Sequence, residues 1–242
     1  MVSLTSYPAR FPTLHLTLGC LLDQSIQADR TILWIALDDL DRLPASVRKL
    51  EGNGLEIRPC EDLGSFKKLI PALEAFPDAF IATADDDLQY PRNWLEALMS
   101  GSEEGVISCQ RAHRMKWSPD GELLPYLKWD FAVQDDEARK PSIDILPTGV
   151  GGILYRPHCL DPRVTNRKLF LRLCPGGDDL WFYWCARVAG TRYRKVGGAF
   201  RIISWPGTQD SSLWSSNAAG GNDRMIRALE AEFGTEILGL GD

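Results

Sequence analysis

The sequence has no long hydrophobic run. Its apolar stretches, such as residues 32–37, are far shorter than the roughly 20 residues that a helix needs to cross a bilayer, which excludes a membrane-spanning protein. The first residues, MVSLTSYPARF, contain neither the basic segment nor the apolar segment of a secretory signal. We therefore expect a cytoplasmic protein.

An excess of positive charge is also missing. The 242 residues include 27 Lys and Arg against 33 Asp and Glu, which leaves a net charge of −6. A protein that binds nucleic acid needs clustered basic residues to neutralise many phosphates. Nucleic acid is therefore excluded as a partner.

Patterns for metal binding and disulfide formation are equally scarce. The three histidines and six cysteines show no CxxC pair and no spacing typical of zinc ligands. At 27.1 kDa the chain can bury about 70% of its extended surface, so folding needs neither a disulfide nor a metal. We expect reduced, mostly buried thiols.

The first 110 residues do contain a regular alternation of short apolar runs and helical patterns. Such alternation is typical of a parallel sheet built from βαβ units. The predicted strands are residues 2–6, 31–37, 55–58, 80–84 and 105–109. The predicted helices are residues 14–23, 44–50, 65–76 with an interruption at Pro71, and 91–99.

This alternation ends after residue 110. Residues 111–147 mix proline, charge and aromatic side chains, which predicts irregular structure or an antiparallel insertion. The aromatic run at 181–184 covers every face of its helix, which favours burial over ligand contact. The remaining predictions are a strand at 149–155 after a glycine-rich turn, helices at 179–188 and 222–233, and a loop at 204–222.

Two of the predicted strands end in aspartates. Asp38 and Asp39 follow the second strand, and Asp85, Asp86 and Asp87 follow the fourth. Ligands of parallel sheets bind beyond the carboxyl ends of the strands, so these residues lie where a ligand would bind. Adjacent carboxylates repel one another unless a cation neutralises them, which indicates a divalent metal ion. The alternative interpretation is a solvated acidic turn that caps the following helix.

Several segments together resemble bacterial glycosyltransferases of the GT-A fold, close to the family 2-like inverting group that builds capsular and lipopolysaccharide glycans. The segments are VSLTSYPARF, TILWIALDD, FKKLIPAL, FIATADDDLQYPRNW, GVGGILYRP and GGDDLWFYW, and they span most of the chain. The resemblance implies a single α/β domain with a Rossmann-like, mostly parallel sheet flanked by helices. Residues 1–110 would bind the donor, and residues 111–242 would bind the acceptor and carry the catalytic base.

The aspartate triplet resembles the DxD motif of this family, which holds the metal and the diphosphate of a nucleotide sugar. The resemblance implies that Asp85 and Asp86 contact the donor and that Asp87 and Asp85 hold the metal. Oxygen ligands of this kind suit Mn²⁺ or Mg²⁺. The resemblance also implies five donor-site residues at family positions around the nucleotide: Thr5, Tyr7, Arg10, Asp38 and Lys68.

A second segment, GGDD at residues 176–179, resembles the acidic pair of the family at the start of a helix beneath the acceptor. An inverting transfer needs a carboxylate there to take the proton of the acceptor hydroxyl. The resemblance implies Asp179 as the base and Asp178 as its support, although the family usually has Glu at the first of these positions. The alternative interpretation is plain capping of the helix N-terminus.

Two sets of late residues are further candidates, one implied by the resemblance and one by the Gly- and Ser-rich composition of residues 204–222. Many relatives have a late histidine as a metal ligand, and no histidine follows residue 160 here. Asn222 and Asp223 are the candidates to replace it. Trp205 and Trp214 are candidates for a lid that excludes water from the site.

The resemblance therefore implies metal-dependent, inverting transfer of a sugar from a nucleotide sugar, preferably a UDP-sugar, in bacterial surface polysaccharide synthesis. The acceptor would be a glycan or glycolipid hydroxyl, met where necessary by peripheral contact with the inner membrane. Two alternatives stay open. A sugar-phosphate nucleotidyltransferase would carry a glycine-rich loop after the first strand, where SYPARFPT has no glycine. A carbohydrate-binding module without activity would need no catalytic base.

Overall fold

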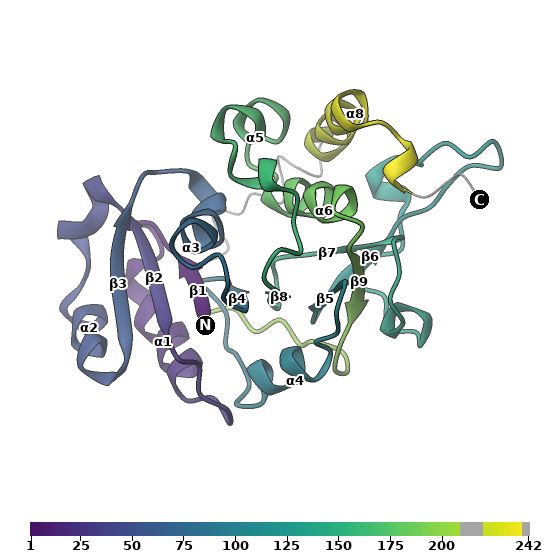
Figure 1. Cartoon of the computed structure of the whole chain (residues 1–242). Helices are drawn as coiled ribbons and strands as arrows, with labels where there is room; N and C mark the ends of the chain where they lie inside the picture. The colour runs from purple at the N-terminus through teal and green to yellow at the C-terminus, as the bar shows by residue number, and fades with distance from the viewer. Residues whose placement is uncertain (209–219, 239–242) are drawn as a thin grey trace.

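The fold is built on one seven-stranded sheet (Figure 1). A computed structural model describes residues 1–208 and 220–238 of the chain. The strands are β1 (Val2–Thr5), β2 (Thr31–Ala36), β3 (Leu55–Cys60), β4 (Ile81–Ala84), β5 (Val106–Cys109), β8 (Ile153–Tyr155) and β9 (Arg192–Lys195). Their order is β3-β2-β1-β4-β8-β5-β9, in which β8 is antiparallel to both neighbours and the other pairs are parallel. The predicted mostly parallel α/β fold is confirmed.

The register of the central strands brings their carboxyl ends to one edge of the sheet. Leu4 of β1 lies beside Leu33 of β2 and Ala84 of β4. The segments that follow these three strands therefore leave the sheet at the same edge, where ligands of such sheets bind.

Helices cover both faces of the sheet, which explains why β2 is buried throughout and apolar after its first residue, Thr31. Its buried side chains alternate, with Ile32 and Trp34 facing one helical layer and Leu33 and Ile35 facing the other. The first layer contains α3 (Ile70–Ala75), α5 (Arg167–Leu173), α6 (Asp178–Val188) and α8 (Asn222–Phe233), and the second contains α1 (Phe11–Leu22), α2 (Ala45–Arg48) and α4 (Trp94–Ser100). Figure 1 shows α5, α6 and α8 on one side of the sheet and α4 on the opposite side.

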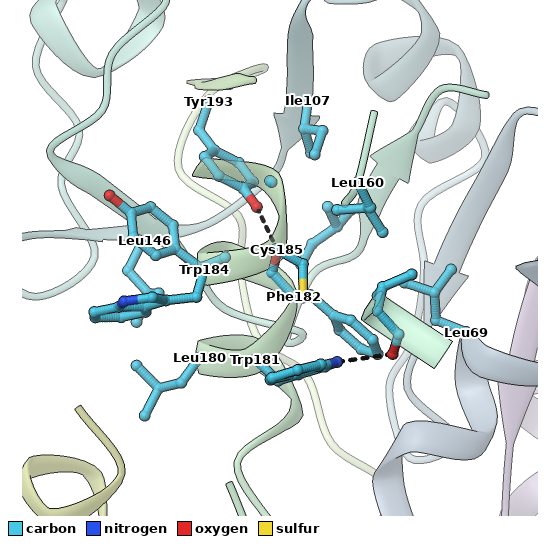
Figure 2. Packing of buried hydrophobic residues seen from close by; sticks show 14 of the residues in the cluster. Leu69, Ile107, Leu146, Leu160, Leu180, Trp181, Phe182, Trp184, Cys185 and Tyr193 are labelled. Carbon is cyan, nitrogen blue, oxygen red and sulfur yellow. Dashed lines mark hydrogen bonds between the residues drawn. The ribbon is translucent and has the colours of Figure 1, made fainter. Parts of the chain in front are cut away.

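The aromatic run of α6 packs at the centre of the first layer (Figure 2). The side chains of Trp181, Phe182, Tyr183 and Trp184 are all buried. The indole Nε1 of Trp181 donates to the carbonyl of Val164 at 2.9 Å, so this polar atom is satisfied inside the core. The prediction that these residues belong to the core is confirmed.

Short helices of the 3-10 type connect the main elements. They are η1 (Leu37–Arg42), η2 (Lys49–Asn53), η3 (Gly64–Lys68), η4 (Tyr126–Lys128), η5 (Glu137–Arg139), η6 (Pro162–Thr165) and η8 (Glu236–Leu238). The helix predicted at residues 65–76 is in fact η3 followed by α3. Pro71 lies in the first turn of α3, where its missing N–H breaks no hydrogen bond, so it begins this helix rather than interrupting it.

The glycine-rich turn before β8 is longer than predicted, and it places a tight bend against α4. Gly152 has a φ of +95°, and a Cβ there would lie 2.5 Å from the ring of Trp94. Only glycine therefore fits this bend. The strand begins at the next residue, Ile153, and not at residue 149 as predicted.

Residues 111–147 form the insertion that the sequence predicts. Two short strands, β6 (Ala112–Arg114) and β7 (Ile145–Pro147), pair antiparallel as a separate two-stranded sheet. Tyr126 and Trp129 from the insertion pack into the first core layer. No helix in the described part of the chain has the length and apolar character that a bilayer span requires.

Candidate active site

A cavity of about 810 Å³ opens at the carboxyl edge of the sheet. Its wall combines segments that follow β1, β4, β5 and β7 with parts of η3 and the first residues of α6 and α8. Both acidic motifs that the sequence analysis singled out, residues 85–87 and 178–179, line this one cavity. The fold thus brings together residues that are more than 90 positions apart in the sequence.

The aspartate triplet forms a turn directly after β4, and each carboxylate has a different partner. Asp85 accepts from Lys68 at 3.1 Å, Asp86 accepts from the hydroxyl of Ser6 at 2.5 Å, and Asp87 accepts from the Arg10 guanidinium at 2.5 Å. The turn therefore gives each of the three adjacent carboxyl groups a separate donor.

The carboxyl group of Asp86 is partly protonated at neutral pH. Burial raises the pKa of Asp86 to about 7, and the charges of Asp87 and Asp85 add to this rise, while the hydroxyl of Ser6 and the charge of Arg10 oppose it. A partly protonated Asp86 reduces the repulsion among the three carboxylates.

Lys68 joins the two acidic motifs. Its Nζ is 3.1 Å from Asp85 and 3.0 Å from Asp178, and its side chain is buried. Burial alone would lower the pKa of Lys68, but the charges of Asp178, Asp85 and Asp179 outweigh burial and raise this pKa well above its usual value. The backbone is fixed as well, because the Ser3 hydroxyl of β1 donates to the Lys68 carbonyl at 2.6 Å.

The acidic pair at the start of α6 faces the cavity and does not cap the helix. Gly177 is the N-cap residue of α6, and no side chain of the described residues caps this helix end. Asp179 Oδ2 accepts from the backbone N–H of Gly149 at 2.9 Å, while its Oδ1 is buried with no hydrogen-bond partner in residues 1–208 and 220–238. The structure therefore argues against the capping interpretation.

The surroundings of Asp179 favour its protonated form at neutral pH or just below. Burial raises the pKa of Asp179 to about 7, and the charge of Asp178 adds to this rise, while Lys68 and the N–H of Gly149 oppose it. A carboxylate with such a pKa can accept a proton near physiological pH.

Gly149 leaves the space in which these charged groups meet. A Cβ at this position would lie 2.6 Å from Lys68 Nζ and 3.1 Å from Asp179 Oδ1. The ammonium group cannot withdraw without breaking its ion pairs, so we expect Gly149→Ala to lower the free energy of unfolding by about 1–3 kcal/mol, measured in urea. Gly52→Ala is the control, because a Cβ there meets no atom within 4 Å. Equal stability of the two variants would contradict this packing.

The structure places the other predicted donor-site residues unequally. Thr5, Tyr7 and Arg10 line the cavity, and the Thr5 hydroxyl donates to the carbonyl of Trp34 at 2.8 Å. Asp38 is exposed at the start of η1 and is not part of the cavity wall. The structure thus brings together all of the predicted donor residues except Asp38.

The late Asn-Asp pair lies at the start of α8. Asn222 lines the cavity, whereas Asp223 is not part of its wall and its Oδ1 accepts from the backbone N–H of Tyr126 at 2.8 Å. Asp223 thereby ties the insertion to α8. Its role as a metal ligand stays a prediction.

One of the two predicted lid residues, Trp205, lies beside the aspartate triplet. The backbone N–H of Trp205 donates to the Asp87 carbonyl at 3.1 Å, and its indole Nε1 donates to the Thr17 hydroxyl of α1 at 2.8 Å. Trp205 is thus held beside the site, and its neighbour Ser204 lines the cavity. Trp214 lies outside the described residues.

Sequence reasoning missed several residues of the cavity wall. The most notable is Arg111, which follows β5 at the same edge of the sheet as the triplet. The rule that pointed to the residues after the second and fourth strands would also have found it, had it been applied to basic residues. Other missed polar residues of the wall include Ser6, Asp62, Ser65, His113, Tyr126 and Thr148.

The donor atoms of the triplet fit Mg²⁺ or Mn²⁺, because these ions prefer carboxylate oxygens. Within residues 1–208 and 220–238, no group of three His, Cys, Asp or Glu side chains is placed to hold an ion. Mg²⁺ usually takes one or two protein carboxylates and completes its coordination with phosphate oxygens and water. An ion that binds together with a diphosphate would thus need no more than two carboxylates of this wall.

The sheet order, the helical layers and the position of the cavity define a GT-A-like fold of the Rossmann type. A mannosyltransferase from Pyrobaculum calidifontis, solved in complex with GDP-Man and Mn²⁺, matches with a TM-score of 0.59 and 16% identity over 98% of this chain and 68% of that chain. A 4-diphosphocytidyl-2C-methyl-D-erythritol synthase from Anaerococcus prevotii matches with a TM-score of 0.51 and 15% identity over 96% of both chains. No protein-family model and no curated protein matches the sequence.

Proposed function

We propose that this protein is a metal-dependent, inverting glycosyltransferase that moves a sugar from a nucleotide sugar to a hydroxyl of a glycan or glycolipid. The observation that carries the proposal is the environment of Asp179. This residue combines a pKa of about 7 with a buried oxygen that has no hydrogen-bond partner in the described part of the chain, and it lines the cavity that also contains the aspartate triplet. An inverting transfer needs such a base opposite the donor.

The donor half of the site would consist of residues 1–110. Arg10 and Lys68 would contact the diphosphate, and Thr5 and Tyr7 would lie along the nucleoside. Asp87 and Asp85 would hold Mn²⁺ or Mg²⁺, whose charge would stabilise the departing diphosphate. The mannosyltransferase with GDP-Man and Mn²⁺ supports a donor of this chemical class. The nucleotide that we propose is a uridine diphosphate.

Charge in the cavity supports a divalent ion with this donor. The wall contains six aspartates but only four lysine and arginine residues. A diphosphate would add further negative charge, which a divalent cation beside the aspartates would offset. A bound metal ion would therefore allow a negatively charged ligand to bind in this acidic cavity.

The acceptor half would be formed by residues 111–242. Asp179 Oδ1 would take the proton of the acceptor hydroxyl as its oxygen attacks the anomeric carbon. The bond from that carbon to the diphosphate would break, and the nucleoside diphosphate would leave with the electron pair. Asp178 would hold Lys68 in place, and through it Asp85. Trp205 and Trp214 would help to exclude water.

The biological setting that we propose is the synthesis of bacterial surface polysaccharide in the cytoplasm. A lipid-linked acceptor would then be reached by contact with the inner face of the membrane.

The second candidate function is nucleotide transfer to a sugar phosphate. The erythritol synthase supports it, because the match covers 96% of both chains. The loop after β1 disfavours it, since residues 6–10 (SYPAR) contain no glycine to approach a triphosphate. A buried base at Asp179 is also unnecessary when a phosphate attacks. Release of diphosphate from UTP with a sugar phosphate would establish this alternative.

Donor binding can be tested by thermal unfolding with UDP and Mn²⁺. We expect the pair together to raise Tm by about 5–10 °C at 100 times the dissociation constant, and UDP alone to raise it much less. Asp87→Asn should remove the Mn²⁺-dependent part, because the amide loses the charge that holds the ion. Asp120→Asn, an exposed position outside the cavity, is the control. No Mn²⁺-dependent shift with UDP or other nucleoside diphosphates, or a full shift in Asp87→Asn, would refute the donor site.

A further inference from the structure

Arg111 differs from the other cations of the cavity wall. Arg10 is paired with Asp87, Lys68 with Asp85 and Asp178, and Lys67 with Asp62. Among the described residues, no carboxylate lies within ion-pair distance of Arg111.

Among residues 1–208 and 220–238, the guanidinium of Arg111 has one hydrogen-bond partner, and that partner is neutral. Its NH1 donates to the hydroxyl of Thr148 at 2.9 Å, and the side chain is only partly exposed. A guanidinium has five N–H donors in a planar arrangement that suits a carboxylate or a phosphate. Most of the binding capacity of Arg111 is therefore not used within the described protein.

His113 contributes a second unused donor in the same wall. Its Nδ1 accepts from the backbone N–H of Ala132 at 2.9 Å, so in the neutral ring the proton is on Nε2. This Nε2 is buried and has no hydrogen-bond partner among the described residues, and the whole side chain is 0% exposed. Burial and the charge of Arg111 lower the pKa of His113 to about 3, so the ring stays neutral.

These two donors lie on the side of the cavity that contains the proposed base. Thr148 binds Arg111 through its hydroxyl, and the next residue, Gly149, binds Asp179 through its N–H. Consecutive Cα atoms are about 3.8 Å apart, so one short backbone segment positions both groups. Arg10, by contrast, is held by the aspartate triplet on the donor side.

We propose that Arg111, supported by the Nε2–H of His113, binds an anionic group of the acceptor and so places its hydroxyl at Asp179. This inference rests on the proposed glycosyltransferase function and narrows it to acceptors that carry a carboxylate or a phosphate. An uncharged acceptor would leave the guanidinium without a direct ion pair among the described residues, in a partly buried wall where only the more distant charge of Asp179 opposes the cost of burial.

Matched pairs of neutral and anionic sugars test this subsite. Methyl glucoside against methyl glucuronide probes a carboxylate, and glucose against glucose 6-phosphate probes a phosphate. Binding is measured by saturation-transfer NMR, with and without UDP and Mn²⁺. We expect at least one anionic sugar to bind 10-fold or more tightly than its neutral counterpart, and the pair concerned identifies the anion.

Variants assign the preference to Arg111. Arg111→Met should remove the preference for the anionic sugar, and Arg111→Lys should keep part of it, because the ammonium retains charge but not the planar donor set. Arg114→Met is the matched control: it removes the same charge from β6 at a position paired with Asp135 outside the cavity wall. This control should keep the full preference.

The outcomes separate the two proposals. Equal binding of both members of each pair, no binding of any sugar, or an unchanged preference in Arg111→Met would overturn the acceptor subsite. A loss of UDP and Mn²⁺ binding in Arg111→Met would also overturn it, because Arg111 would then serve the donor. Failure of wild-type protein to bind any nucleoside diphosphate would instead count against the proposed function.

Discussion

Replacing Asp179 by Asn should lower kcat for sugar transfer by about 10²- to 10⁴-fold, the range expected when a general base is removed. The amide keeps the shape of the carboxylate and can still accept from the N–H of Gly149. Binding of UDP and Mn²⁺ should therefore change little. The measurement is transfer from a nucleotide sugar, with the donor thermal shift recorded on the same samples.

The pH dependence provides a second test of Asp179. In wild-type protein kcat should rise with pH through about 7, because only the ionised carboxylate can accept the proton. The folded chain holds the proton of Asp179 more tightly than the unfolded chain, since the pKa rises from 3.8 to about 7 on folding. The stability from this group is thus complete below pH 3.8 and is lost as the pH rises to about 7.

Asp179→Asn should consequently be more stable than wild type at pH 8, by up to about 4 kcal/mol, and little different at pH 4. Urea unfolding at both pH values measures this difference. We expect the variant to lose activity and gain stability, because the ionised base destabilises the folded protein.

Asp178→Asn is the matched comparison for Asp179→Asn. Asp178 is paired with Lys68 at 3.0 Å, so its replacement should disturb the position of Lys68 and reduce kcat less than Asp179→Asn does. If Asp178→Asn lowered kcat more than Asp179→Asn does, Asp178 would be the base and Asp179 its support. A biological role that survives Asp179→Asn unchanged would favour a carbohydrate-binding module without activity.

Replacing Lys68 by Met should lower the free energy of unfolding by about 3–5 kcal/mol, because a buried ion network would lose its cation. Asp85, Asp178 and Asp179 would then face one another without a positive charge between them. The loss should be larger at pH 8 than at pH 5, since protonation relieves the repulsion at the lower pH. Urea unfolding at the two pH values measures both effects.

Lys67→Met is the control for Lys68→Met. Lys67 is also buried, but its partner Asp62 has a side chain that is 68% exposed and can be hydrated when the lysine is lost. We expect Lys67→Met to lower the free energy of unfolding by about 1 kcal/mol or less. Equal losses in the two variants would mean that Lys68 has no special place between the acidic motifs.

The sheet and much of the site could be predicted because their signals are local. A run such as TILWIA is buried on both faces, and its apolar pattern shows this directly in the sequence. The acidic residues after β4 follow an element that the pattern predicts. Parallel strands bring the end of β4 to the same edge as the ends of β1 and β2. The start of α6 follows α5 and not a strand, so the family resemblance, rather than the strand pattern, implied its place in the site.

Other parts have weak or misleading local signals. The strand β9 has the sequence RYRK, in which only alternate residues, Tyr193 and Lys195, are buried, so it resembles a polar loop. The helix α5 has two buried residues, Phe170 and Leu173, among seven. Asp38 follows a strand just as Asp85 does, but the 3-10 helix η1 begins at once and leaves it exposed. Charge alone does not distinguish these two aspartates.

The antiparallel strand β8 has a consequence for how the chain folds. It lies between β4 and β5 and pairs Ile81 with Tyr155, so the sheet is closed only when segments far apart in the sequence meet. Pairings of this separation slow folding, because loop-closure entropy is lost before the contacts form. During synthesis the edge of β4 would stay unpaired, and open to association with other strands, until residues 153–155 emerge. Residues 1–110 and residues 111–242 each supply strands of the one seven-stranded sheet, so neither part completes the sheet by itself.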